Sequence, residues 1–183
     1  MEDFGAPERK YLRPEAGLTL TDGRVIEGYA SLFGLADQGG DVVQKGAYGA
    51  SLARLSARGE KVRMLWQHDP TQPIGVWEEV REDATGLWVK GRILSEVEKG
   101  REAAALLQAG AIDGLSIGYR TVKANRDDKG RRLLSELELW EVSLVTFPML
   151  REARVSAKSD EDGWHWQQLA TLIHAARQEL AER

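Results

Sequence analysis

The chain has 183 residues, a formal net charge of −4 and no cysteine. Its 42% hydrophobic and 30% charged residues are typical of a soluble globular protein with one core. The acidic balance argues against general nucleic-acid binding, and the lack of cysteine excludes disulfides, thiol catalysis and cysteine-based metal sites. No apolar run reaches the length of a membrane span, and the N-terminus lacks the features of a signal peptide, so we expect a cytoplasmic protein.

The first third of the sequence predicts an arm, a hairpin and a short helix. Residues 1–16 are polar and contain two prolines, which indicates a flexible N-terminal arm ahead of a domain over 17–155. Segments 18–21 and 24–30 flank Asp22-Gly23, a strong signal for a tight turn between two strands. After a loop at 39–41, apolar residues at helical spacing predict a helix that stops at Gly59; they are Tyr48, Leu52 and Leu55.

The middle of the chain predicts a strand, a second hairpin and a second helix. Residues 62–68 alternate as a strand, and we expect Pro70 and Pro73 to end it. Segments 74–80 and 87–94 form the next hairpin. Ser95 and Glu98 have the spacing of a capping box, so Ser95 should be the N-cap of a helix; its apolar stripe consists of Ala103, Leu106, Leu107 and Gly110.

The last third predicts one long hairpin and a terminal helix. Strands at 115–122 and 133–147 flank a turn at 125–130, and 151–162 has the composition of a linker. Apolar residues on one side predict a C-terminal amphipathic helix within 156–183; they are Leu169, Leu172, Ile173, Ala176 and Leu180. This order of elements predicts an antiparallel α+β domain and not alternating βαβ units.

His68 is the first candidate for chemistry. Alternation along 62–68 places it on the same face as Val62, Met64 and Trp66, at the end of a buried row. An ordinary core-edge histidine bonded to a backbone carbonyl would give the same pattern. The alternatives, His165 and His174, both lie in the C-terminal region outside the predicted strands.

Ser116 and Glu141 are the other two candidates. Ser116 shares its face with Gly114 and Gly118, which would let a substrate backbone approach closely, although packing of a helix on the sheet could also require these glycines. Glu141 stands in an inward phase, with Leu137, Leu139, Ser143 and Val145 expected on its face. A buried carboxylate needs a donor, either an imidazole N–H or a structural arginine.

Hairpin geometry predicts that Ser116 and Glu141 are close. A symmetric turn between Asp128 and Lys129 makes them direct cross-strand neighbours, with Cβ atoms roughly 4.5–5.5 Å apart. His68, at the end of a neighbouring strand, could then contact both. A serine hydroxyl becomes nucleophilic when an imidazole accepts its proton and a carboxylate orients that imidazole, so the three residues predict a serine peptidase.

Residues 114–118 also fit the G-x-S-x-G pattern of α/β-hydrolase esterases. That pattern requires a strand, a sharp turn and then a helix, with the histidine last in the chain order. Here a helix precedes Ser116, a strand follows it, and only the peripheral histidines come later. The esterase interpretation therefore fails on its context.

With these residues in place, the sequence resembles the prohead (maturation) protease family of tailed phages, and closely the version found in bacterial gene transfer agents. The resemblance extends over about 24–155. Its blocks, in order, are residues 28–33, 41–43 with 46–48, 65–68, 74–76, 86–89, 114–119 and 141–145. The sequence after Pro148, Met149-Leu150-Arg151-Glu152, departs from the family pattern.

The resemblance implies a compact antiparallel β-barrel flanked by helices, as in the herpesvirus capsid protease. It places the catalytic histidine on His68, the nucleophile on Ser116 and the third member on Glu141. It implies a cytoplasmic serine endopeptidase inside the assembling procapsid. This enzyme would cleave the scaffolding segment of the major capsid protein, a separate scaffold and often itself, with no metal or cofactor and no nucleic-acid or membrane partner.

Several alternatives stay open at this point. The protein could be a homodimer or higher oligomer, and the C-terminal helix could pack on the domain, pair two protomers or form a cleaved tail. Trp164-His165-Trp166 reads as an anchor and not as a metal site. Oxyanion donors are expected near Arg151 after Phe147. The rival function is a non-catalytic assembly protein that keeps the fold only to bind capsid subunits.

Overall fold

The computed structural model describes residues 18–21, 23–150, 153 and 155–157. Within them lie nine strands and two helices: β1 (Leu18–Thr21), β2 (Val25–Leu32), β3 (Asp41–Val43), α1 (Gly49–Ala57), β4 (Arg63–Trp66), β5 (Asp69–Glu82), β6 (Gly86–Ile93), α2 (Glu98–Gln108), β7 (Gly114–Arg126), β8 (Arg132–Val145) and β9 (Val155–Ala157). The predicted N-terminal arm and C-terminal helix, with Trp164-His165-Trp166 and His174, lie outside the described residues, so the predicted domain bounds stay a prediction.

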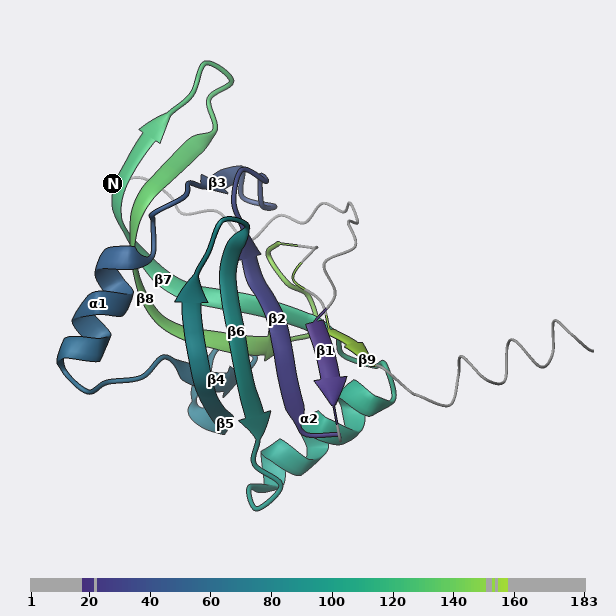
Figure 1. Ribbon diagram of the computed structural model, residues 1–183. Helices are drawn as coiled ribbons and strands as arrows, with labels where there is room; N and C mark the ends of the chain where they lie inside the picture. Colours follow the sequence, from purple (N-terminus) through teal and green to yellow (C-terminus); the bar gives the residue numbers. More distant parts are fainter. Residues whose placement is uncertain (1–17, 22, 151–152, 154, 158–183) are drawn as a thin grey trace, which may run out of the picture.

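The strands form one curled half-barrel. Their order is β3-β8-β4-β5-β6-β2-β1-β9, and β7 pairs with β8 on the other side. Figure 1 shows β5, β6, β2 and β1 side by side, with β7 and β8 crossing behind them. The predicted α+β class is confirmed at this level.

The sheet is mixed, which corrects the prediction of a purely antiparallel barrel. β3 and β4 both run parallel to β8, and β9 runs parallel to β1. Two of these strands are very short: β3 falls where a loop was predicted, and β9 falls within the predicted linker. Three-residue strands have too few positions for alternation to reveal them, because long-range pairing alone defines them.

The first hairpin and both helices largely follow the predictions. β1 and β2 are antiparallel, and Gly23 has the positive φ of 65° that the turn requires. α1 ends before Gly59, whose N–H bonds the carbonyl of Ser56 at 3.1 Å. α2 begins later than predicted, because its N-cap is Val97 and no side chain caps it. The capping-box interpretation of Ser95 is therefore wrong.

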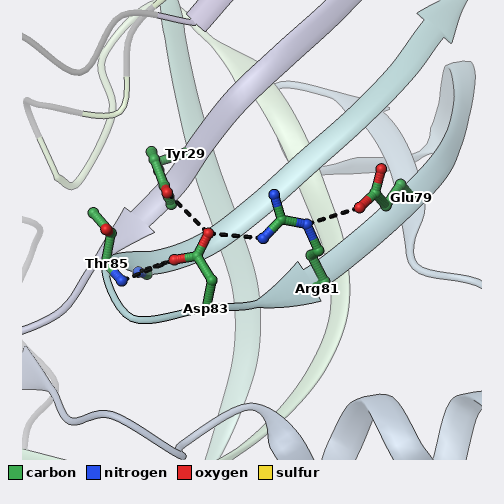
Figure 2. Close-up of polar contacts among 6 residues, drawn as sticks. Tyr29, Glu79, Arg81, Asp83 and Thr85 are labelled. Atoms are coloured by element: carbon green, nitrogen blue, oxygen red, sulfur yellow. Dashed lines mark hydrogen bonds and ion pairs between the residues drawn. The ribbon is translucent and has the colours of Figure 1, made fainter.

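The β5–β6 hairpin is held by a partly exposed polar cluster (Figure 2). The Asp83 carboxylate accepts hydrogen bonds from the Tyr29 hydroxyl at 2.9 Å, from Arg81 at 2.8 Å and from the Thr85 N–H at 2.8 Å. β5 begins at Asp69, so Pro70 and Pro73 lie inside it and do not separate two strands as predicted. Register shifts opposite this stretch relieve the need for the N–H groups that proline lacks.

The core lies between the layers of the curled sheet and beneath α1 and α2. Its largest buried side chains include Trp77, Tyr48, Met64 and Leu115. The Trp77 indole N–H donates to the carbonyl of Val142 at 3.2 Å, which ties β5 to β8 across the core. β8 is therefore fixed on both sides, and it positions the candidate site.

Candidate active site

A bulge in β8 decides which side chains face the site. The pairing of β8 with β7 shifts between Tyr119↔Leu139 and Gly118↔Glu141, which leaves Trp140 as an extra residue. Leu137 and Leu139 belong to the core before the bulge; after it, the core residues of β8 are Val142 and Leu144. Because strand residues alternate, Glu141 and Ser143 point away from that core row. The prediction that Leu137 and Leu139 share the face of Glu141 is wrong for this reason.

The register brings Ser116 and Glu141 to one face, although not as direct partners. Ser116 pairs with Ser143, and Gly118 pairs with Glu141. The predicted direct pairing is therefore wrong by two residues. The turn accounts for one residue of this shift in register, because it closes with a bond from the Asp127 N–H to the Arg131 carbonyl. The bulge at Trp140 accounts for the other residue. A shift of one residue would turn Glu141 to the other face of the strand pair, but a shift of two residues returns it. Ser116 and Glu141 therefore share a face and are diagonal neighbours.

His68 lies in a tight turn and not on a strand face. β4 ends at Trp66, which pairs with Asp69, and the two residues between them have positive φ values of 52° and 62°. Two successive positive φ values are the requirement of a two-residue type I′ hairpin turn. The predicted strand position of His68 is therefore wrong, but the turn carries its ring to the same neighbour that was expected.

The His68 ring and the Glu141 carboxylate are hydrogen bonded. His68 Nδ1 lies 2.5 Å from Glu141 Oε1, and the other carboxylate oxygen accepts from the Ser143 hydroxyl at 2.5 Å. The side chain of Glu141 is 4% exposed and that of His68 is 42% exposed. An ionised carboxylate only accepts hydrogen bonds, so the proton of a neutral His68 ring is on Nδ1 and Nε2 is the basic nitrogen.

Gly118 gives the carboxylate its space. A Cβ atom at this position would lie 2.1 Å from Glu141 Oε1 and 2.6 Å from its carboxyl carbon. Position 118 thus requires a glycine, because the Glu141 side chain on the opposite strand occupies the space of a Cβ atom. Packing within the site therefore explains the second glycine of the G-x-S-x-G pattern. The first glycine, Gly114, makes room for Pro148 and the Val145 carbonyl.

Ser116 borders a pocket of about 190 Å³ at the outer edge of β7. The side chain of Ser116 is nearly buried, with 4% of the residue exposed. The pocket is mostly apolar and is lined from β2, the β2–β3 loop, β3, β7 and the segment before residue 151. Its members are Ala30, Ser31, Leu32, Leu35, Asp37, Asp41, Val43, Leu115, Ser116, Ile117, Tyr119, Met149 and Leu150. A cavity beside a serine is where a reacting group can be held.

The charged end of this pocket is acidic. Burial raises the pKa of the Asp37 carboxyl, and the nearby Asp41 charge raises it further, against the hydrogen bonds from the Asp41 and Gly39 N–H groups. Burial also raises the pKa of the Tyr119 phenol, which donates to Asp41 at 3.4 Å. Arg132 lies 3.5 Å from Asp41 and balances one of the two carboxylates.

The structure brings two of the three predicted residues into direct contact. His68 and Glu141 are bonded, and Ser116 lies on their face, but no hydrogen bond joins His68 to Ser116 within the described part of the chain. Such bonds are often long without substrate and shorten in the complex. Arg151, near which oxyanion donors were predicted, lies outside the described residues.

Ser143 is the residue that the sequence reasoning missed. Its hydroxyl bonds Glu141, and it is the cross-strand partner of Ser116. A feature of the sequence could have identified Ser143, because residues 141 and 143 are two apart on one strand and therefore share a face. Among the described residues, no group of three or more His, Asp or Glu side chains could hold a metal ion.

The sequence matches the family described as "Caudovirus prohead serine protease" over residues 13–164. The chain belongs to this family. The predicted resemblance to the prohead proteases of tailed phages is thereby confirmed, while the closer likeness to gene transfer agents stays a prediction. No helix in the described part of this prohead protease family member is long and apolar enough to cross a membrane.

Two curated relatives match this chain over part of their own length. It is 33% identical over 145 residues to the "Prohead protease" of Enterobacteria phage HK97, covering 76% of this chain and 62% of that protein. It is 30% identical over 109 residues to the "Capsid polyprotein" of Pseudomonas phage PAJU2, covering 55% of this chain and 16% of that protein. The chain therefore spans less than two thirds of the length of either relative.

A solved structure shares the fold. The capsid assembly protease of bacteriophage T4 superposes with a TM-score of 0.50 at 16% sequence identity, over 66% of this chain and 82% of that one. At this identity the likeness concerns the fold alone.

Proposed function

We propose that the protein is a serine endopeptidase that cleaves capsid or scaffold proteins during procapsid maturation. Membership in the prohead serine protease family supports this class of activity. The observation that carries the proposal is the 2.5 Å bond between His68 Nδ1 and Glu141 Oε1. That bond leaves Nε2 as the basic nitrogen, and Ser116, on the same face of the strand pair as Glu141, borders a pocket.

The proposed reaction is acyl transfer to Ser116. The Ser116 hydroxyl attacks the scissile carbonyl while His68 Nε2 accepts its proton, and His68 then gives that proton to the leaving amine. Water repeats the sequence on the acyl-enzyme and releases the second product. Glu141 holds the Nδ1–H and stabilises the imidazolium that forms in each step.

The pocket supplies the place for the substrate peptide. Among the described strands β7 pairs with β8 alone; at its other edge the Leu115 N–H donates to the Ala153 carbonyl at 2.6 Å, and the pocket borders Leu115, Ser116 and Ile117. A peptide extended along that edge past Leu115 would place one side chain in the pocket and its carbonyl near Ser116. The lining is mostly apolar with carboxylates at one end, so an acidic substrate side chain is disfavoured there.

The proposed substrates are the scaffolding segment of the major capsid protein, a separate scaffold and the protease's own chain. The proposed place of action is the interior of the assembling procapsid, and the catalytic unit is placed within residues 17–155. A herpesvirus-like barrel is part of the same proposal, supported by the curled sheet and its two helices.

Co-expression with the cognate capsid protein tests this function. Wild type should cut the capsid protein at discrete positions, and Ser116→Ala should lower the rate at least about 10⁴-fold while binding persists. Ser135→Ala is the control, because Ser135 lies on the same hairpin, where its hydroxyl donates to the Lys123 carbonyl at 3.4 Å, away from the candidate site. Uncut capsid protein with the wild type would favour the non-catalytic assembly protein instead.

A further inference from the structure

Ser143 lies at the centre of the candidate site without being one of its three reacting groups. It is fully buried, with 0% of the residue exposed, and it stands directly opposite Ser116 across the β7–β8 pair. A buried hydroxyl is costly unless its donor and its acceptor are both used. Both are used here, and both bonds go to the site.

The Ser143 hydroxyl has one proton, and that proton goes to the acid. Ser143 Oγ donates to Glu141 Oε2 at 2.5 Å, while Glu141 Oε1 accepts from the His68 ring. The two carboxylate oxygens therefore have separate partners. Because the bond to Ser143 fixes the rotation of the carboxylate, it also fixes the direction in which Oε1 meets the imidazole.

The same oxygen accepts a hydrogen bond from the turn that carries the base. The His68 backbone N–H donates to Ser143 Oγ at 3.2 Å. Gln67 donates its N–H to the Leu144 carbonyl of β8 at 2.8 Å. Its side-chain amide also donates to the hydroxyl of Thr146, just after β8, at 2.7 Å and accepts from the Thr146 N–H at 3.3 Å. A non-glycine residue with positive φ is strained, so the turn depends on such bonds to keep its shape.

We propose that Ser143 is a positioning residue that sets the acid and the base at once. One hydroxyl joins the Glu141 carboxylate to the backbone of His68 and so fixes the imidazole over the strand pair that carries Ser116. This inference rests on the proposed peptidase function. Ser143 acts through Glu141 and His68 and does not itself touch the scissile bond.

The opposite assignment, with Ser143 as the nucleophile, does not fit the geometry. Its proton is committed to a carboxylate and its surface is buried, whereas Ser116 borders the pocket. A fluorophosphonate probe tests this directly, since it labels the activated serine. Label on Ser116 in wild type supports the assignment, and label on Ser143 would overturn it.

Steady-state cleavage of a capsid-derived peptide measures the positioning role. Ser143→Ala should lower kcat about 10–100-fold, the effect of losing a hydrogen bond to a charged group, with KM within about twofold. Ser143→Thr keeps the hydroxyl and should recover most of kcat. The downfield proton resonance of the His68–Glu141 bond should weaken in Ser143→Ala and return in Ser143→Thr.

A double-mutant cycle separates positioning from general destabilisation. In a Glu141→Ala background, adding Ser143→Ala should lower kcat less than about twofold, because the group through which Ser143 acts is gone. The matched control is Ser51→Ala, since Ser51 is also buried and also bonds β8, through the Leu139 N–H at 2.9 Å. It should lower stability and leave kcat unchanged.

The outcomes distinguish this inference from the proposed function. Wild-type kcat in Ser143→Ala, or fully multiplicative losses in the cycle, would overturn the role of Ser143 while an inactive Ser116→Ala still supports the peptidase. An active Ser116→Ala would instead remove the peptidase itself. If Ser143→Ala does not fold, Ser143→Cys, which keeps the size but has a weak donor, is compared with Ser143→Thr in the same way.

Discussion

Two carboxylates in this protein collect several hydrogen bonds each, with different results. Glu141 lies on β8 with its side chain 4% exposed and is bonded by a ring nitrogen and a hydroxyl. Asp83 lies at the β5–β6 turn with its side chain 24% exposed and is bonded by Tyr29, Arg81 and backbone N–H groups (Figure 2).

The difference lies in what each network leaves for chemistry. The partners of Asp83 are a phenol, a guanidinium and backbone amides, which donate hydrogen bonds to it, so this network holds the hairpin. The Glu141 network ends on an imidazole, whose second ring nitrogen is left to accept a proton, and it lies on the face of a serine beside a pocket. Bond number alone therefore does not identify a functional site.

Breaking the buried network at its acid should have the largest effect on activity. Glu141→Gln keeps the shape but replaces an acceptor with an amide that can force the wrong imidazole tautomer. We expect kcat to fall about 10²–10⁴-fold, less than in Ser116→Ala, while some activity remains. Peptide cleavage kinetics check this, and a variant as fast as wild type would remove Glu141 from the mechanism.

Displacing the same carboxylate should have an intermediate effect. Gly118→Ala would place a Cβ atom 2.1 Å from Glu141 Oε1, so the carboxylate must move away from His68. We expect a loss of kcat of about tenfold or more, with a loss of stability of about 1–3 kcal/mol from overpacking.

The control for Gly118 is Gly49→Ala. Gly49 begins α1, and a Cβ atom there would meet no atom within 4 Å. Since alanine favours a helix over glycine, Gly49→Ala should leave kcat unchanged and raise the free energy of unfolding by a few tenths of a kcal/mol or more. Equal losses of kcat in both glycine variants would contradict the steric explanation.

Breaking the Asp83 network should change stability and leave catalysis intact. Burial opposes ionisation of Asp83, but the N–H groups of Thr85 and Gly86, the Tyr29 hydroxyl and Arg81 outweigh it and lower the pKa to about 2. Asp83→Asn should therefore reduce the free energy of unfolding by roughly 1 kcal/mol at pH 7, with kcat and KM unchanged.

The sign of the pH dependence follows from the lowered pKa of Asp83. A carboxyl whose pKa is lower in the folded state stabilises the fold above its ordinary value, and this contribution disappears as the pH falls toward about 2. The difference between wild type and Asp83→Asn should shrink below pH 4 in urea unfolding experiments. A difference that is constant from pH 7 to pH 3 would show that the carboxylate charge is not involved.

The sequence predicted features that depend on short stretches of chain. The turn at Gly23 and the end of α1 before Gly59 both follow from local conformational preference, and both glycines have the expected positive φ. His68, Ser116 and Glu141 were singled out by residue type and scarcity, and the bond between His68 and Glu141 supports two of them.

The sequence did not predict features that depend on contacts between distant segments. The bulge at Trp140 arises because β8 must satisfy β7 on one side and β4 on the other, which no period within β8 reveals. Likewise, Gln67 and His68 adopt positive φ without the glycine or asparagine that usually marks such a turn. Bonds from β8 hold that turn, so only its neighbour explains it.

By itself the sequence determined which groups are available for chemistry: one histidine near a strand end, one serine between glycines and one acid among apolar residues. The tertiary structure decided how they meet, through a bulge and a turn shift that together return Glu141 to the face of Ser116, and through Ser143, which links the acid to the base. The physical reason is that composition and periodicity act along the chain, whereas register and close approach are set by the strands on either side.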